Sequence, residues 1–280
     1  MDVVAEHKID VERASIFADV LRLLNRERVP YVVAGAFAVG YYTGLWRDTK
    51  DMDLFLVRED AERGMRILST IGFTCWIEAE HWLGKCTRGD TMVDLIYGYG
   101  NWFRSIDRAW IDRAQPSELF GVRVLFAPLE EMILSKSFVA HRERFDGADI
   151  VHLIRASRGK LDWDHLVRRY GEYQDLLLPY LLLFRFIYPS EGWVIPDRIM
   201  MKLIERVKEQ MNEPTSIERV CRGPLLDRYQ FVYDIDDLGY HDPREELAVA
   251  QGGTREQVVL DRQIARRMLE NGRVRPREEW

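Results

Sequence analysis

Three aspartates interrupt apolar segments of this sequence. Asp51 and Asp53 open the segment DMDLFLV, and Asp94 lies within TMVDLIYG. Residues i and i+2 of a strand point to the same face, so Asp51 and Asp53 would project side by side. If the two segments pair as neighbouring strands, three carboxylates meet, and divalent cations would relieve their repulsion. Hard oxygen ligands favour Mg²⁺ or Mn²⁺ over zinc. Asp51, Asp53 and Asp94 are therefore predicted to be catalytic and metal-binding, with two ions acting in a phosphoryl displacement.

The alternative for such a pair of aspartates is a turn cap and a solvated strand edge. The same chain contains the triplet Asp234-Ile235-Asp236, which no apolar strand follows, and which is interpreted as solvated surface. The earlier pair has a different context, because an apolar segment ends at Gly35 and a short helical segment follows at once. Glycine permits close approach of the backbone to a ligand, and a helix N-terminus offers free N–H groups to phosphate oxygens. A triphosphate site beside the carboxylates is therefore predicted.

Two other chemistries use paired aspartates of this spacing. Haloacid dehalogenase-type phosphatases place the pair after an apolar strand, whereas here the apolar residues follow it, and Phe55 stands where threonine or valine is needed. Glycosyltransferases that use sugar nucleotides generally have a longer nucleotide-binding region before the pair. Neither pattern is typical of this chain.

Hydrophobic periodicity predicts the elements that position these residues. Helices are expected over residues 10–29, 36–44 and 59–72, and strands over 31–35, 51–57, 73–79, 81–87 and 91–98, with a hairpin-like pair over 117–128. From residue 129 the period is helical, and the apolar segment 176–188 is too short to span a bilayer and contains Arg185. The expected organisation is an α/β core over 1–127, a helical region over 128–233, and a polar tail over 234–280 with one helix.

The segment AGAFAVGYYTGLWRDTKDMDLFL, followed by VDL, resembles the DNA polymerase β-like nucleotidyltransferase superfamily. The stretch containing Arg47, Thr49, Asp51 and Asp53 is most similar to its small prokaryotic branch, which includes AbiEii-type toxins. The resemblance covers roughly residues 28–155. It implies a mixed sheet flanked by helices, then a mainly helical C-terminal region. Where the family usually has Gly or Ser after the first glycine, this chain has Ala36, which offers a phosphate its backbone N–H but no hydroxyl.

The resemblance also implies nucleotide-binding residues outside the carboxylate motif. They are Gly35, Ala36, Arg47, Thr49, Lys136, Arg142 and Asp149. Lys136, together with Arg142 or Arg144, would neutralise triphosphate charge, and Asp149 would orient a cation or help activate the acceptor. The alternative for Lys136 and Asp149 is an exposed helix face with salt bridges between successive turns.

The implied reaction transfers a nucleoside monophosphate from a nucleoside triphosphate to an acceptor hydroxyl and releases pyrophosphate. The acceptor is expected to be tRNA or other RNA, or a protein, in a toxin-like role with an antitoxin partner. A small-molecule acceptor of the aminoglycoside type is the second candidate. The third is a non-catalytic nucleotide- or partner-binding protein on the same scaffold.

Composition bounds these alternatives. The chain has 280 residues, 47% of them hydrophobic and 31% charged, with a formal net charge of -6, as in globular domains rather than disordered or membrane ones. An acidic balance argues against a surface that coats nucleic acid broadly. The three cysteines, Cys75, Cys86 and Cys221, have neither metal-finger nor redox spacing, and their odd, sparse number favours a reducing compartment. With no signal-like segment at the start, a cytoplasmic location without membrane attachment is expected.

Overall fold

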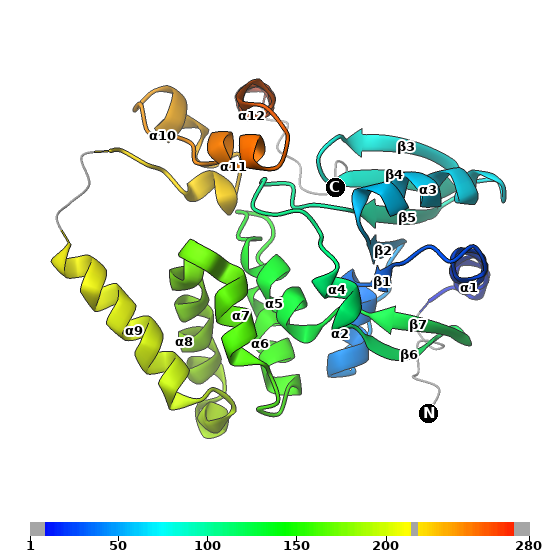
Figure 1. Cartoon of the computed structure of the whole chain (residues 1–280), viewed down its shortest axis with the longest axis horizontal. Coiled ribbons are helices and arrows are strands. Elements are labelled where there is room, and N and C mark those ends of the chain that lie inside the picture. The colour runs from blue at the N-terminus through cyan, green and yellow to red at the C-terminus, as the bar shows by residue number, and fades with distance from the viewer. Residues whose placement is uncertain (1–8, 214–217, 272–280) are drawn as a thin grey trace. The chain divides into compact units, whose positions relative to one another are not determined.

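The structure is a computed structural model that describes residues 9–213 and 218–271 (Figure 1). The chain divides into two compact units. Of the described residues, the first unit takes in 9–100 and 105–132, and the second takes in 101–104, 133–213 and 218–271.

The first unit contains a seven-stranded mixed sheet. Its strands lie in the order β3-β4-β5-β2-β1-β7-β6, with β2 parallel to β5, β1 parallel to β7, and the other neighbours antiparallel. Helices lie between the strands along the chain, as the sequence predicts, and the α/β prediction for this part is confirmed. The strands are β1 (Val32–Val33), β2 (Asp51–Phe55), β3 (Thr74–Ala79), β4 (Leu83–Arg88), β5 (Thr91–Ile96), β6 (Gln115–Leu119) and β7 (Val122–Phe126).

The helices of the first unit begin and end at residues with clear local reasons. Asp10 caps the first helix by accepting hydrogen bonds from the N–H groups of Glu12 and Arg13. Gly44 ends the second in the left-handed conformation, at φ 72°, which glycine adopts without strain. The helices are α1 (Val11–Arg26), α2 (Gly35–Thr43), α3 (Arg58–Ser69), α4 (Ala109–Asp112) and the first part of α5 (Leu129–Ser137).

Helix α3 covers one face of β3, β4 and β5. The contact is close because small residues face it: a Cβ on Gly84 would lie 2.8 Å from the Met65 sulfur, and one on Gly64 would lie 3.5 Å from Leu95. Leu95 and its β2 partner Leu54 are fully buried. Side chains alternate along a strand, so the neighbouring polar residues of β2, β4 and β5 project from the opposite face.

The second unit is helical. Its elements are α6 (Gly147–Ala156), α7 (Trp163–Tyr170), η1 (Gly171–Leu176), α8 (Leu177–Ile187), η2 (Pro189–Val194), α9 (Asp197–Asn212), η3 (Gly223–Leu225), α10 (Val232–Asp236), α11 (Arg244–Ala250) and α12 (Arg255–Glu270). The prediction of a helical C-terminal region is confirmed. The segment expected to be a polar tail with one helix instead contains the end of α10 and all of α11 and α12.

Buried ion pairs explain why that polar segment is folded. Arg244 is 1% exposed and pairs with Asp242 at 2.8 Å and with Asp261 of α12 at 2.9 Å. Arg262 pairs with the same Asp242 at 3.1 Å. Charges that look solvated in the sequence therefore connect α11 to α12, because each buried charge has a partner of opposite sign.

The cysteine prediction needs a correction. Cys75 of β3 and Cys86 of β4 are directly opposite each other in the antiparallel pair and form a disulfide bond. The two cysteines are 11 residues apart in the sequence, and the register of β3 and β4 brings them together. The cysteine-based argument for a reducing compartment therefore loses its basis, and the cytoplasmic location stays a prediction. Within the residues the structure describes, no helix has both the length and the apolar character that crossing a membrane requires.

Candidate functional site

Two of the predicted aspartates are side by side in the sheet. Strands β2 and β5 are parallel neighbours, and Asp53 is the register partner of Asp94, while Asp51 is paired with Met92. Asp51 and Asp53 are partly exposed, whereas Met52 and Leu54 between and after them are buried. The alternation expected of a half-buried strand therefore holds, and all three aspartates project from the face of the sheet opposite α3.

The predicted phosphate loop is in contact with this face. Gly35, the first residue of α2, has φ 53°, and a Cβ at this position would lie 1.7 Å from the Asp53 Oδ2 atom. The backbone N–H of Ala34 donates to the carbonyl oxygen of Asp53 at 2.9 Å. No side chain caps the start of α2 at Ala34, and both Gly35 and Ala36 are partly exposed. The N-terminus of α2 is thus held directly beside the Asp53 carboxylate.

The loop before β2 orients the first aspartate. The hydroxyl of Thr49 donates a hydrogen bond to the Asp51 carboxylate, and its oxygen also lies 3.1 Å from the Asp51 carbonyl oxygen, the alternative acceptor for the same proton. Thr49 therefore positions Asp51, and its contact with a nucleotide stays a prediction. Arg47 is exposed, and Arg13 of α1 fixes the loop by donating to the carbonyl oxygen of Thr49 at 3.3 Å.

Asp94 has an unusual environment for a carboxylate. Its side chain is buried, and its Oδ1 atom has no hydrogen-bond partner. Burial raises the pKa of Asp94 to about 6; the nearby ammonium of Lys85 opposes the rise, and the charges of Asp51 and Glu78 add to it. A buried carboxylate with an unsatisfied oxygen is costly, which marks Asp94 as a candidate for function rather than for stability.

The donor atoms at this site suit one magnesium-like cation. Asp51 and Asp53 offer carboxylate oxygens on one face of β2, and Mg²⁺ is commonly held by one or two carboxylates together with substrate phosphates. A full three-carboxylate site is a different matter, since the described part of the chain contains no group of three or more His, Cys, Asp or Glu side chains placed to hold a metal ion. The residues fit a cation on the aspartate pair, and the predicted second ion is not supported by their present arrangement.

Sequence reasoning missed Lys85. This lysine lies on β4 directly opposite Asp94, and its side chain is buried. The signal was available: a turn at Gly89 and Asp90 places Arg88 opposite Thr91, and counting back along both strands brings position 85 opposite position 94. Trp76 of β3 is in turn opposite Lys85.

Three of the predicted nucleotide-binding residues lie in the second unit. The Lys136 ammonium pairs with Asp146 at 2.9 Å and with Asp149 at 2.8 Å. All three side chains are buried, so the alternative of an exposed helix face is wrong for them. Arg142 is exposed, with its backbone N–H donating to Asp227 at 3.1 Å. The roles of Lys136, Arg142 and Asp149 toward a nucleotide stay predictions.

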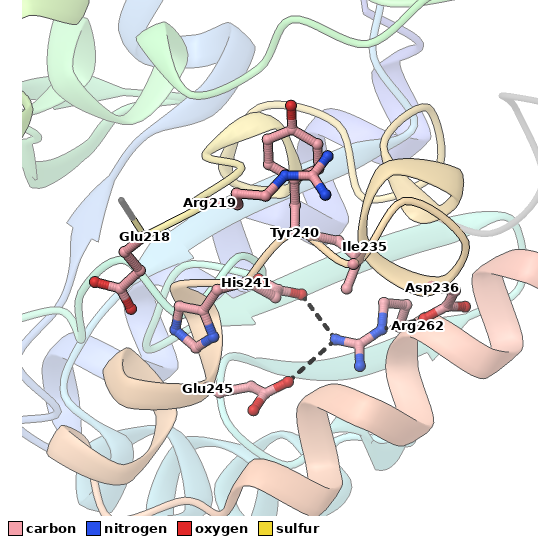
Figure 2. Close-up of a pocket in the computed structure, with 10 residues that line it drawn as sticks. Glu218, Arg219, Ile235, Asp236, Tyr240, His241, Glu245 and Arg262 are labelled. Atoms are coloured by element: carbon pink, nitrogen blue, oxygen red, sulfur yellow. Dashed lines mark hydrogen bonds and ion pairs between the residues drawn. The ribbon is translucent and has the colours of Figure 1, made fainter. Parts of the chain in front are cut away.

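The second unit also has a polar cavity of about 690 Å³ between its C-terminal elements (Figure 2). Arg262 of α12 crosses it and is held by Asp236 at 2.8 Å, Asp242 at 3.1 Å and Glu245 at 3.3 Å. Asp236 belongs to the triplet interpreted as solvated surface, and here it has an ion-pair partner. Four of the charged residues that line this cavity are therefore paired with one another, and their ion pairs connect α12 to α10, to α11 and to the segment between them.

Comparisons with known proteins gave matches among solved structures alone. No protein-family model matches the chain, and no curated protein sequence matches it. The solution structure of the antibiotic-resistance factor ANT(2'')-Ia is 15% identical, over 65% of this chain and 95% of that one, with a TM-score of 0.43. The lincomycin-bound lincosamide antibiotic adenylyltransferase LnuA is 15% identical, over 52% and 98%, with a TM-score of 0.39.

An antigenic nucleotidyltransferase-like protein from Paracoccidioides brasiliensis is 17% identical, over 65% of this chain and 93% of that one, with a TM-score of 0.45. By name, these matches include an adenylyltransferase and a nucleotidyltransferase-like protein, and the nucleotidyl transfer that the sequence motif predicts for this chain stays a prediction. The assignment to the AbiEii-type branch stays a prediction.

Proposed function

We propose that the chain is a metal-dependent nucleotidyltransferase that moves a nucleoside monophosphate from a nucleoside triphosphate to an acceptor hydroxyl. One observation carries the proposal: Asp53 and Asp94 are register partners on parallel strands, and the uncapped N-terminus of α2 lies against Asp53. Carboxylates that hold a cation and N–H groups that hold phosphate oxygens are the two elements that nucleotidyl transfer needs.

The binding part of the mechanism belongs to Gly35, Ala36 and the aspartate pair. The N–H groups at the start of α2 would donate to the β- and γ-phosphate oxygens. The absence of a side chain at Gly35 lets the Asp53 carboxylate lie against the backbone at this point. Asp51 and Asp53 would hold a Mg²⁺ or Mn²⁺ ion. Such an ion, when bound, withdraws negative charge from the phosphate oxygens and stabilises the leaving group.

In the chemical step, Asp94 acts as the base for the acceptor hydroxyl. The acceptor oxygen forms a bond to the α-phosphorus, the bond from that phosphorus to the bridging oxygen breaks, and pyrophosphate leaves with the bonding pair. The hydroxyl proton is transferred to the Asp94 carboxylate, whose Oδ1 atom accepts no hydrogen bond in the folded chain. Because burial brings the pKa of Asp94 nearer to neutrality than that of an exposed aspartate, this group is a stronger base than an ordinary carboxylate.

The acceptor is proposed to be an RNA such as tRNA, or a protein side chain, with an antitoxin as regulatory partner. A small molecule of the aminoglycoside type is the alternative within the same reaction. On a non-catalytic scaffold the chain would bind nucleotide without transfer. The presence of all three aspartates favours catalysis over the non-catalytic scaffold.

The test combines binding with transfer. Calorimetry with Mg²⁺ and each nucleoside triphosphate measures binding, and incubation of the chain with labelled triphosphates and cell extract reveals the labelled acceptor. Asp53→Asn is expected to abolish labelling, with circular dichroism confirming its fold, while Asp90→Asn, a change at an exposed turn residue, leaves labelling intact. Nucleotide binding without labelling or pyrophosphate release would contradict the transfer reaction, and labelling by the Asp53→Asn chain would contradict the site.

A further inference from the structure

On the face of the sheet opposite α3, a buried lysine lies next to the three aspartates. Register partners run across four strands from Trp76 to Lys85, then Asp94, then Asp53. Lys85 is 6% exposed, as is Asp94. Lysine and aspartate are rarely this buried without a charge of opposite sign nearby, and directly opposite positions of antiparallel strands bring their Cβ atoms to about 5 Å.

We infer that Lys85 takes the place of one of the two divalent cations, so that the site binds a single divalent ion at Asp51 and Asp53, and the Lys85 ammonium supplies the fixed positive charge beside Asp94. The inference rests on the proposed function, because it assumes that these carboxylates bind a cation.

Burial and charge separate the two halves of the site. Asp51 and Asp53 are partly exposed and adjoin the start of α2, where a phosphate-bound ion can reach them. Asp94 and Lys85 are buried together on the neighbouring strands. A second divalent ion at Asp94 would have to lose its water shell next to a like-charged ammonium, and repulsion between like charges is strong where water is excluded.

The arrangement of acidic groups agrees with this division. Within the described ranges, no three acidic, histidine or cysteine side chains are grouped to bind a metal ion together. The Thr49 hydroxyl orients the Asp51 carboxylate, whereas Lys85 stands on the far side of Asp94 from Asp53 in the strand order. Asp94 is thus left as a proton acceptor whose negative charge has a permanent counter-charge.

The test counts ions rather than reaction products. The full chain is titrated with Mn²⁺ alone, with free Mn²⁺ measured by electron paramagnetic resonance and the heat by calorimetry. We expect one ion for the wild-type chain, two for Lys85→Met and one for Lys85→Arg, which keeps the charge. Lys50→Met is the matched control: it removes an exposed lysine next to Asp51 and should leave one ion.

Each other result has a distinct meaning. Two ions on the wild-type chain, or one ion on a folded Lys85→Met chain, overturn the inference and leave the proposed function standing. No ion on any variant also overturns the inference, and the proposed function is then judged separately by the labelling experiment with nucleoside triphosphates. If Lys85→Met fails to fold, Asp94→Asn decides, because it should keep the single ion, with a weaker affinity after loss of a neighbouring negative charge, while Asp53→Asn loses it. Loss of the ion from Asp94→Asn refutes the division of the site.

Discussion

Replacing Asp94 by asparagine is expected to stabilise the folded chain at neutral pH while removing the proposed activity. Burial raises the pKa of this carboxyl to about 6 from an ordinary value of 3.8, with Lys85 partly opposing the rise. Between pH 3.8 and about 6, the folded state therefore holds a proton on Asp94 that the unfolded state has already released. At about 1.4 kcal/mol for each pH unit between the two ionisations, the charged form costs the folded chain about 3 kcal/mol at pH 7.5.

The sign of the pH dependence follows from the same two ionisations. Below the unfolded value both states are protonated, and the carboxyl costs nothing. As pH rises from 3.8 to about 6 the unfolded chain ionises first, so the wild-type chain loses stability relative to Asp94→Asn, and above about 6 the difference is constant. The advantage of the variant should thus be about 3 kcal/mol at pH 7.5 and below about 1 kcal/mol at pH 4.

Urea unfolding in the presence of EDTA, followed by circular dichroism between pH 4 and 8, measures this difference. Asp90→Asn is the control, because Asp90 is exposed in the turn before β5 and its change should alter stability by less than about 0.5 kcal/mol at every pH. The reasoning would be refuted if Asp94→Asn were less stable than wild type at pH 7.5. It would also be refuted if the variant exceeded wild type in stability by the same amount at pH 4 as at pH 7.5.

Two further substitutions test contacts described above by urea unfolding. Gly35→Ala brings a Cβ within 1.7 Å of the Asp53 Oδ2 atom and should lower the free energy of unfolding by about 2–4 kcal/mol. The control Gly44→Ala has a similar φ and no atom within 4 Å, and should lower it by about 1 kcal/mol. Equal losses for the two variants would contradict the contact. Lys136→Met leaves two buried carboxylates without their ammonium and should lower the free energy of unfolding by about 3–5 kcal/mol. The control Lys160→Met changes an exposed lysine and should lower it by less than about 0.5 kcal/mol. A small loss for Lys136→Met would mean that its two partners are solvated.

The predictable part of the site is the part that periodicity determines. The apolar alternation of DMDLF and TMVDLI made β2 and β5 recognisable, and adjacent placement of Asp53 and Asp94 required only that these strands pair. Glycines at positions 35 and 44 marked the limits of α2, because the backbone has a positive φ at both positions and glycine adopts it readily. These features depend on residues close in sequence or on repeating patterns.

The missed features depend on register and on burial across loops. The Cys75–Cys86 bond requires knowing which residues of β3 and β4 are opposite, and the pairing shifts between Ile77 and Ala79. The ion pairs of Lys136 with Asp146 and Asp149 close across a loop whose path no periodicity reports. Charge patterns on single helices therefore suggested solvent exposure where the folded chain buries the pairs.

The two-residue connection between β4 and β5 has a consequence for how this site can change. Its length determines which side chain of β4 stands next to Asp94, because strand residues alternate between faces. One inserted residue there would point Lys85 towards α3 and bring Gly84 or Cys86 level with the aspartate. A single-codon insertion would then remove the Lys85 ammonium from the centre as completely as an exchange of that lysine, and would open the centre to another metal ion.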